Sequence, residues 1–274
     1  MYQYLEIYPT DYCQLSCSGC NLHFNKTSLS EKQIAKIAES KILSKVTKEI
    51  SIVGGEPTKW EYLNDFLHLC RLSNNKVSIN VTTNAIDINS DFIMACLDNN
   101  IGVNVSWHDN KDILDNILKL KKNKVLKKII IIPTTKNINS FDKIYSKLSL
   151  IAPCVSRPFV GNESIKNLVS LLNKKLLDLK QEINIESSTR YIDRKLCDNI
   201  QTVIDASNNK NFYKKYECKC GKNAVIYTDG NMYHCLSQAI NGINPMHSYR
   251  DTKDIWIQCK YDMCCCDTFD LRKK

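Results

Sequence analysis

Short apolar segments alternate with amphipathic segments along the first 160 residues, and this alternation restricts the possible folds more than any other feature of the chain. The apolar segments are nearly continuous, as in strands buried on both faces, and the segments between them have helical spacing. We therefore expect a parallel sheet whose outer face is covered by helices. The expected strands are 2–8, 49–55, 77–84, 101–107, 127–135 and 154–160, and the expected helices are 30–43, 60–72, 90–97, 111–121 and 141–150.

Six strand–helix units are fewer than the eight that close a full barrel of this class. The predicted fold is therefore α/β, a partial (β/α)6 TIM-like barrel with its functional loops at the carboxyl ends of the strands. Seven of the 14 cysteines lie between Cys218 and Cys266, beside a hairpin signal at Asp229-Gly230. We predict a barrel core over 1–182, a connecting segment over 183–215 and a small cysteine-rich domain over 216–274.

The composition limits the class of protein. With 43% hydrophobic and 24% charged residues, the chain can bury a large core, which argues against disorder. The first residues lack the pattern of a signal peptide, and no apolar run reaches the length of a membrane span. We expect a cytoplasmic protein without a membrane partner, in which clustered cysteines bind metal more often than they form disulfides. The net charge of +9 permits nucleic-acid binding, but the lysines are scattered, so this partner is less favoured.

Three cysteines, Cys13, Cys17 and Cys20, form a C-x3-C-x2-C motif directly after the first predicted strand. Three thiolates on one short loop can ligate three irons of a [4Fe-4S] cluster and leave the fourth iron open. A cluster that only transfers electrons would need a fourth protein ligand. The alternative is a set of incidental thiols.

A second motif, Gly54-Gly55-Glu56-Pro57, follows the second predicted strand. Paired glycines let a ligand approach the backbone closely, and a carboxylate beside exposed carbonyls suits a cationic amine. The alternative is a tight turn between a strand and a helix.

Together the two motifs resemble those of the radical S-adenosylmethionine superfamily. The resemblance implies that the open iron binds S-adenosylmethionine and that the backbone of 54–57 contacts its methionine amine. It also implies that one electron from the cluster cleaves the sulfonium to a 5′-deoxyadenosyl radical, which abstracts a substrate hydrogen. By position, Asn84 and Ser106 resemble residues that touch polar atoms of the cofactor. Where this family usually has an aromatic residue before the third cysteine, the chain has Gly19.

The sequence does not single out a catalytic side chain. His108 is a candidate proton donor or ligand, although a lone histidine in a loop usually has neither role. Four isolated cysteines, Cys70, Cys96, Cys154 and Cys197, are best interpreted as small packing residues.

The C-terminal cysteines resemble the opening of the SPASM and Twitch auxiliary-cluster domains, because Gly230 stands between an upstream cysteine and Cys235 at the spacing of that motif. The resemblance implies one auxiliary [4Fe-4S] cluster, and a tetrahedral zinc site is the alternative. Its candidate ligands are Cys218 or Cys220, Cys235, Cys264 and Cys266.

The predicted function is hydrogen abstraction from a peptide or protein side chain, as in the maturation of ribosomally made peptides, with the auxiliary cluster assisting oxidation or substrate binding. An electron donor such as flavodoxin or ferredoxin is the expected partner. Since the first motif begins at Cys13, we expect no N-terminal leader-recognition domain. The alternatives are a small-molecule dehydrogenase or oxidase of the same superfamily, an RNA-modifying radical enzyme, and a noncatalytic metal-binding module that contacts nucleic acid.

Overall fold

The computed structural model describes most of the first 156 residues of the chain and shorter ranges after them. The described residues are 1–15, 17, 20, 22, 26–108, 111–134, 137–156, 171, 174, 189–192, 195–196, 216–218, 223–242, 245–246, 257–258 and 268–273.

The chain is built around an eight-stranded sheet with the order β11-β10-β1-β2-β3-β4-β5-β6. All neighbouring strands in it are parallel except β10 and β11. The first six strands are β1 (Tyr2–Ile7), β2 (Val46–Ile52), β3 (Ser78–Thr83), β4 (Gly102–Trp107), β5 (Leu126–Ile131) and β6 (Cys154–Ser156). This arrangement confirms the predicted α/β partial barrel.

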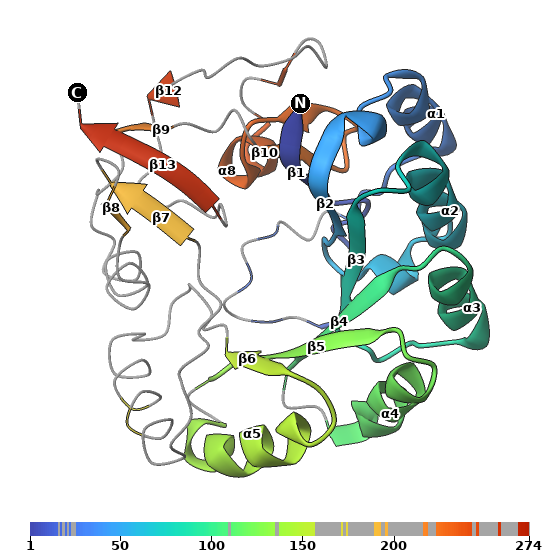
Figure 1. Ribbon diagram of the computed structural model, residues 1–274, viewed down its shortest axis with the longest axis vertical. Coiled ribbons are helices and arrows are strands. Elements are labelled where there is room, and N and C mark those ends of the chain that lie inside the picture. The colour runs from blue at the N-terminus through green and yellow to red at the C-terminus, as the bar shows by residue number, and fades with distance from the viewer. Residues whose placement is uncertain are drawn as a thin grey trace.

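Five helices cover one face of this sheet, and Figure 1 shows them as an outer row beside the curved strands. They are α1 (Glu31–Glu39), α2 (Leu63–Ser73), α3 (Ser90–Asp98), α4 (Leu114–Lys122) and α5 (Phe141–Ser149). Two of their starts follow from short polar residues. Ser30 is the N-cap of α1, and its N–H donates to Gln33 Oε1 at 2.8 Å. The Oδ1 of Asn89 accepts from the N–H of Phe92 at the start of α3.

The main core lies between the sheet and these helices. In β4, Val103, Val105 and Trp107 belong to one buried cluster with Ile117 and Leu120 of α4. Burying one such aliphatic side chain contributes about 1.5–3 kcal/mol. Because side chains of a strand alternate between faces, the residues between them face the concave side of the sheet. In β4 these residues are Asn104 and Ser106, so this strand presents polar side chains away from the core.

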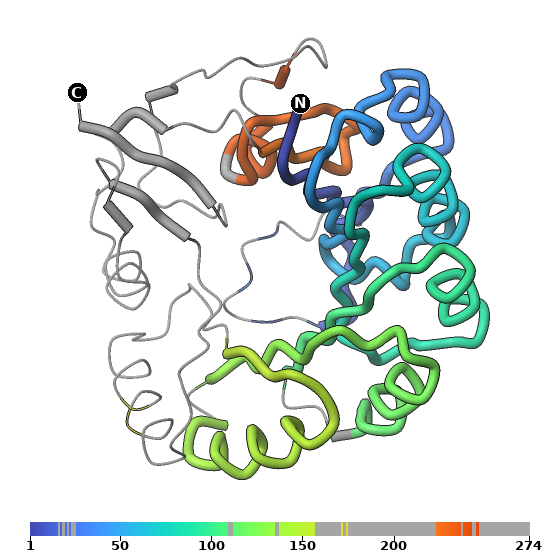
Figure 2. The backbone as a smooth tube through the Cα atoms, in the orientation of Figure 1, coloured from blue at the N-terminus to red at the C-terminus, as the bar shows by residue number. Residues whose placement is uncertain are grey.

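Residues near the C-terminus extend this sheet, which the sequence did not predict. β10 (Asn223–Ile226) pairs in parallel with β1 and continues through a turn at Asp229–Gly230 into β11 (Met232–Tyr233) and α8 (Leu236–Ile240). The hairpin itself is the one expected from the sequence. Figure 2 shows it beside β1, on the side away from β2. The apolar segment NAVI of β10 therefore covers an edge of β1 that would otherwise expose unpaired backbone groups.

A second sheet has the order β12-β9-β13-β7-β8. Its strands are β7 (Thr189–Ile192), β8 (Lys195–Leu196), β9 (Tyr216–Cys218), β12 (Ile257–Gln258) and β13 (Thr268–Lys273). The predicted domain boundaries, 182/183 and 215/216, fall on residues outside the described ranges or at their margin, so they stay predictions. No helix in the described part of the chain has the length and apolar character needed to cross a bilayer.

Candidate functional site

The loop that carries Cys13, Cys17 and Cys20 is fixed at both of its ends. Asp11 N–H donates to the carbonyl of Thr27 at 3.0 Å, and Thr27 N–H donates to Asp11 Oδ1 at 2.6 Å. The hydroxyl of Thr27 also lies 3.0 Å from Asp11 Oδ2. The Asp11 side chain is buried, so these bonds to a carboxylate are shielded from water.

The C-terminal hairpin also contacts Thr27. The hydroxyls of Thr27 and Thr228 share a hydrogen bond of 2.9 Å, and Thr228 lies two residues after β10. The end of the cysteine loop is therefore connected to the strand that extends the sheet beyond β1.

The two glycines of the second motif allow the loop after β2 to approach the loop after β1. A Cβ on Gly54, which has φ +133°, would lie 2.6 Å from the carbonyl oxygen of Thr10. A Cβ on Gly55 would lie 2.2 Å from the carbonyl oxygen of Tyr12. In this contact Gly55 N–H donates to Thr10 at 2.8 Å, and Glu56 N–H donates to Tyr12 at 2.7 Å. The glycines therefore hold the start of the cysteine loop against the end of β2.

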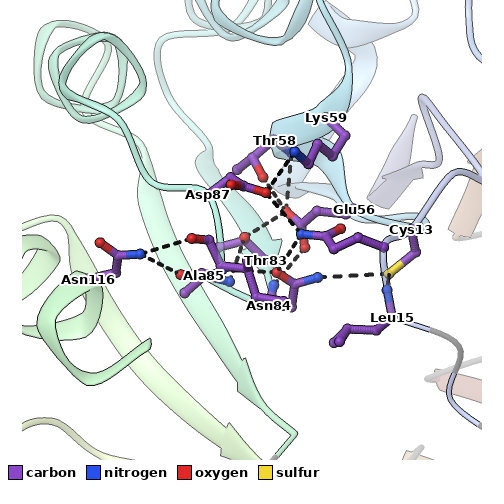
Figure 3. A network of polar contacts seen from close by, with 12 residues as sticks. Cys13, Leu15, Glu56, Thr58, Lys59, Thr83, Asn84, Ala85, Asp87 and Asn116 are labelled. Atoms are coloured by element: carbon purple, nitrogen blue, oxygen red, sulfur yellow. Dashed lines mark hydrogen bonds and ion pairs between the residues drawn. The ribbon is translucent and has the colours of Figure 1, made fainter. Parts of the chain in front are cut away.

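The Glu56 side chain is 1% exposed and points toward the ends of β2 and β3, as Figure 3 shows. Its carboxylate accepts from Thr83 Oγ1 at 2.6 Å, from the N–H of Asn84 at 2.7 Å and from Thr58 Oγ1 at 2.7 Å. Burial raises the pKa of Glu56 above its usual value, although these donors act in the opposite direction. The carboxylate thus positions the protein's own loops, and Pro57 opens the 3-10 helix Pro57–Lys59 beside it.

Asn84 is the first residue after β3, and its side chain is directed at the cysteine loop (Figure 3). Its Nδ2 lies 3.8 Å from Cys13 Sγ, and its Oδ1 accepts from Ile86 N–H at 3.0 Å. The next residue, Ala85, has φ +58°, which costs a residue with a Cβ about 1–2 kcal/mol. Asn116 Nδ2 donates to the carbonyls of Ala85 and Ile86 and so supports this turn. The structure therefore brings together two residues that the sequence singled out, Asn84 and Cys13.

His108 is the first residue after β4, and its Nδ1 lies 3.6 Å from Cys17 Sγ. Burial lowers the pKa of His108 to about 4, so its ring is neutral near pH 7. A neutral imidazole has one N–H, and a thiolate partner favours the tautomer with that proton on Nδ1.

The three cysteines have the chemistry that an iron–sulfur cluster requires. All are partly exposed free thiols, and Cys20 N–H donates to the carbonyl of Cys17 at 3.1 Å. Burial raises the pKa of Cys13 and of Cys17, and the negative charge of neighbouring thiolates raises both further. A bound cation would relieve this repulsion. Among the described residues, no group of three or more metal-ligating side chains is arranged around a single ion. A [4Fe-4S] cluster takes one thiolate on each of three irons, and the three thiols of this loop supply that donor set.

The remaining predicted site residues are only partly described. Ser106 lies in β4, in register with Ile130 of β5, and makes no side-chain hydrogen bond within the described ranges. Cys235 is the buried N-cap of α8, and Cys218 is the last residue of β9. Cys220, Cys264 and Cys266 lie outside the described residues, so their convergence stays a prediction.

Three isolated cysteines are confirmed as packing residues, because Cys70, Cys96 and Cys154 belong to the main buried cluster. The fourth, Cys197, lies outside the described residues.

Comparisons with known proteins bear on the fold. Neither protein-family models nor curated protein sequences gave a match. Among solved structures, SuiB from Streptococcus suis bound to S-adenosylmethionine aligns with a TM-score of 0.65 and 14% identity over 90% of this chain and 63% of SuiB. The chain thus spans less than two thirds of that protein. Another structure, anSMEcpe with bound AdoMet, aligns with a TM-score of 0.61 and 16% identity over 92% of this chain and 79% of its own.

The chain has the same fold as SuiB and anSMEcpe. Two of the similar structures also contain peptides: SuiB bound to precursor peptide SuiA, at 17% identity, and anSMEcpe with bound AdoMet and Cp18Cys peptide, at 16%. Within this shared fold, Cys13, the 54–57 loop and Asn84 meet at the carboxyl ends of β1, β2 and β3 of this chain.

Sequence reasoning missed the polar residues that hold this arrangement. Asp11, Thr27 and Thr228 look like ordinary turn residues in the sequence, and nothing in a linear pattern connects positions 27 and 228. His108 was noted, but its contact with Cys17 was not predicted. Their positions were the one available signal, because Asn84 and His108 each directly follow a strand, where the functional loops of such a fold lie.

Proposed function

We propose that this protein is a radical S-adenosylmethionine enzyme in which Cys13, Cys17 and Cys20 ligate a [4Fe-4S] cluster. The observation that supports this most directly is the position of the cysteine loop at the carboxyl edge of the sheet, where Asn84 contacts Cys13 and His108 contacts Cys17. When bound, the cluster and S-adenosylmethionine together supply a radical that removes a hydrogen atom from a substrate.

The chain's own residues hold and orient this site. Glu56 fixes the backbone of Asn84, and Asn84 in turn directs its amide toward Cys13. Gly54 and Gly55 keep the loop after β2 against the start of the cysteine loop, so the 54–57 backbone is the proposed contact for the methionine amine. Ser106 is the proposed polar contact one strand further along. Tyr227, Tyr233 and Leu236 form a buried cluster with Tyr8, which excludes water from the β1 side of the sheet.

A peptide or protein side chain is the proposed substrate. The support is that SuiB and anSMEcpe, which share the fold, have structures with bound peptides. The proposed auxiliary [4Fe-4S] cluster, with Cys235, Cys264, Cys266 and either Cys218 or Cys220 as ligands, would assist oxidation or substrate binding. An electron donor such as flavodoxin or ferredoxin would reduce the first cluster.

The test is anaerobic reconstitution followed by iron, sulfide and zinc counting. We expect about eight irons per chain, as two clusters require. About four irons together with zinc would instead indicate one cluster and a zinc site in place of the auxiliary cluster. A Cys13→Ala, Cys17→Ala, Cys20→Ala variant should lose the reductive formation of 5′-deoxyadenosine. The matched control Cys96→Ala, which removes a buried thiol of α3, should keep it. Retention of that product by the triple variant would overturn the proposal.

The substrate class has its own test. With candidate peptides carrying deuterium on their side chains, deuterium should appear in the 5′-deoxyadenosine that the enzyme forms. If only small metabolites donate deuterium, the peptide assignment is wrong while the enzyme class stands.

A further inference from the structure

Two neighbouring strand ends each place one side chain on one cysteine of the loop. Asn84 directly follows β3 and contacts Cys13 at 3.8 Å, and His108 directly follows β4 and contacts Cys17 at 3.6 Å. The contacting atoms are Nδ2 of Asn84 and Nδ1 of His108. While such a nitrogen contacts a cysteine sulfur, it does not bind iron in place of that sulfur. Their common geometry is that of a donor directed at a ligand sulfur.

The two cysteines differ in what else surrounds them. The N–H of Leu15 and the amide of Asn84 both donate to Cys13 Sγ. In the described part of the chain, the polar side chain that contacts Cys17 Sγ is that of His108, at 3.6 Å. A thiolate at Cys17 accepts hydrogen bonds and cannot donate them, so it orients the imidazole with N–H at Nδ1.

We propose that His108 is a positioning residue that donates its Nδ1–H to the Cys17 thiolate and thereby sets the reduction potential of the cluster bound there. This inference rests on the proposed function. A hydrogen bond to a ligand sulfur stabilises the additional negative charge of the reduced cluster, and so raises the potential. His108 acts through Cys17 and touches neither substrate nor iron in this role.

The test uses substitutions that separate the donor from the shape of the ring. His108→Asn places an amide nitrogen near the position of Nδ1, whereas His108→Gln places it near the position of Nε2. His108→Leu introduces a side chain of almost the shape of Asn without a hydrogen-bond donor. The midpoint potential of the cluster is measured by redox titration followed by electron paramagnetic resonance, in cluster-loaded protein without substrate. A His68→Leu variant is the matched control, since His68 of α2 pairs with Asn99, the C-cap of α3, and not with a cysteine of the loop.

His108→Leu and His108→Gln should shift the midpoint potential to more negative values, His108→Asn should stay near the wild-type value, and His68→Leu should not move it. Loss of iron from His108→Leu alone, with His108→Asn still loaded, would also support the donor role. Equal potentials in His108→Leu and wild type, or a shift in His108→Asn as large as in His108→Leu, would overturn the inference. So would loss of the cluster from all three His108 variants, because ring shape rather than the donor would then be required.

The outcome for the wild-type protein separates the two proposals. If wild-type protein loads no cluster, the proposed function fails and this inference fails with it. If wild-type protein loads the cluster and the His108 variants do not differ in potential, only the role of His108 is wrong.

Discussion

The Oγ1 of Thr83 lies 2.6 Å from Oε1 of Glu56, and this contact joins the ends of two neighbouring strands. Glu56 follows β2, and Thr83 is the last residue of β3. Because the same carboxylate also accepts from the N–H of Asn84, its position determines the direction of the next side chain, which contacts Cys13. A motif residue that the sequence suggests as a ligand for an amine thus functions, in the described geometry, as a support for the cysteine loop.

Replacing Glu56 by Gln should alter the pH dependence of stability. Because burial raises the pKa of Glu56 above its usual value of 4.5, the folded chain binds this proton more tightly than the unfolded chain does. The stability that the group contributes is therefore fully present below that value and is lost as the pH rises through the folded-state pKa. We expect the unfolding free energy of wild type minus that of Glu56→Gln to decrease as the pH rises above 4.5. Urea unfolding over a pH series measures this, and an increase with pH would show that the donors from Thr58, Thr83 and Asn84 outweigh burial.

Gly55→Ala should be strongly destabilising. The new Cβ would lie 2.2 Å from the backbone oxygen of Tyr12, which cannot move without displacing the start of the cysteine loop. We expect a loss of about 2 kcal/mol or more in urea unfolding, together with lower iron retention. Gly242→Asn is the control, because a Cβ there would meet no atom of the described residues within 4 Å beyond its chain neighbours, and Asn tolerates its φ of +60°. Equal stability of the two variants would contradict the close approach.

Thr228→Val should weaken the contacts that fix the cysteine loop at Thr27. The substitution keeps the side-chain shape and removes the hydroxyl that bonds Thr27, so we expect a loss of about 1 kcal/mol. It should also speed proteolysis within residues 12–26, which limited digestion with mass spectrometry detects. Thr47→Val, on an exposed position of β2, is the control, because it removes a hydroxyl that donates to the Tyr2 carbonyl at 3.1 Å and not to the cysteine loop. The prediction is wrong if both variants are cleaved at the same rate as wild type.

Thiol alkylation should separate the cysteines into two groups. Burial raises the pKa of Cys96 to about 12 and raises that of Cys70 further, so neither forms the reactive thiolate in the folded chain near pH 8. In metal-free protein we expect iodoacetamide to modify the partly exposed Cys13, Cys17 and Cys20 first. Cys70 and Cys96 should react only after urea unfolding, as peptide mass spectrometry can follow. Early modification of Cys70 would contradict its placement in the core.

The strands and helices of the first 160 residues were predictable because their signals are local. Apolar runs such as 101–107 and 129–132 need only their own side chains to show that they are buried, and the amphipathic segments between them must then cover the sheet. The two motifs were recognisable for a similar reason, since Gly54 and Gly55 serve a close backbone approach that few other residues permit.

The contacts that hold the site could not be predicted in this way. The partner of Asp11 is Thr27, and the contact of His108 is Cys17, which lies 91 residues earlier in the chain. Such pairs depend on which strands become neighbours, and the sequence pattern does not state this. The pairing of β10 with β1 is the clearest example, because a short apolar strand suits any open sheet edge equally well.

This pairing has a consequence for the order in which the protein can be assembled. Ile7, just before the cysteine loop, pairs with Ile226, so a ribosome must synthesise most of the chain before that side of β1 is covered. Throughout this interval the far end of the cysteine loop lacks its contact with Thr228. Contacts between residues so distant in sequence also form late in folding, because closing a long loop costs entropy before any bond is gained. For the proposed cluster, the topology therefore favours delivery of iron and sulfide after the segment with Thr228 has been synthesised rather than before.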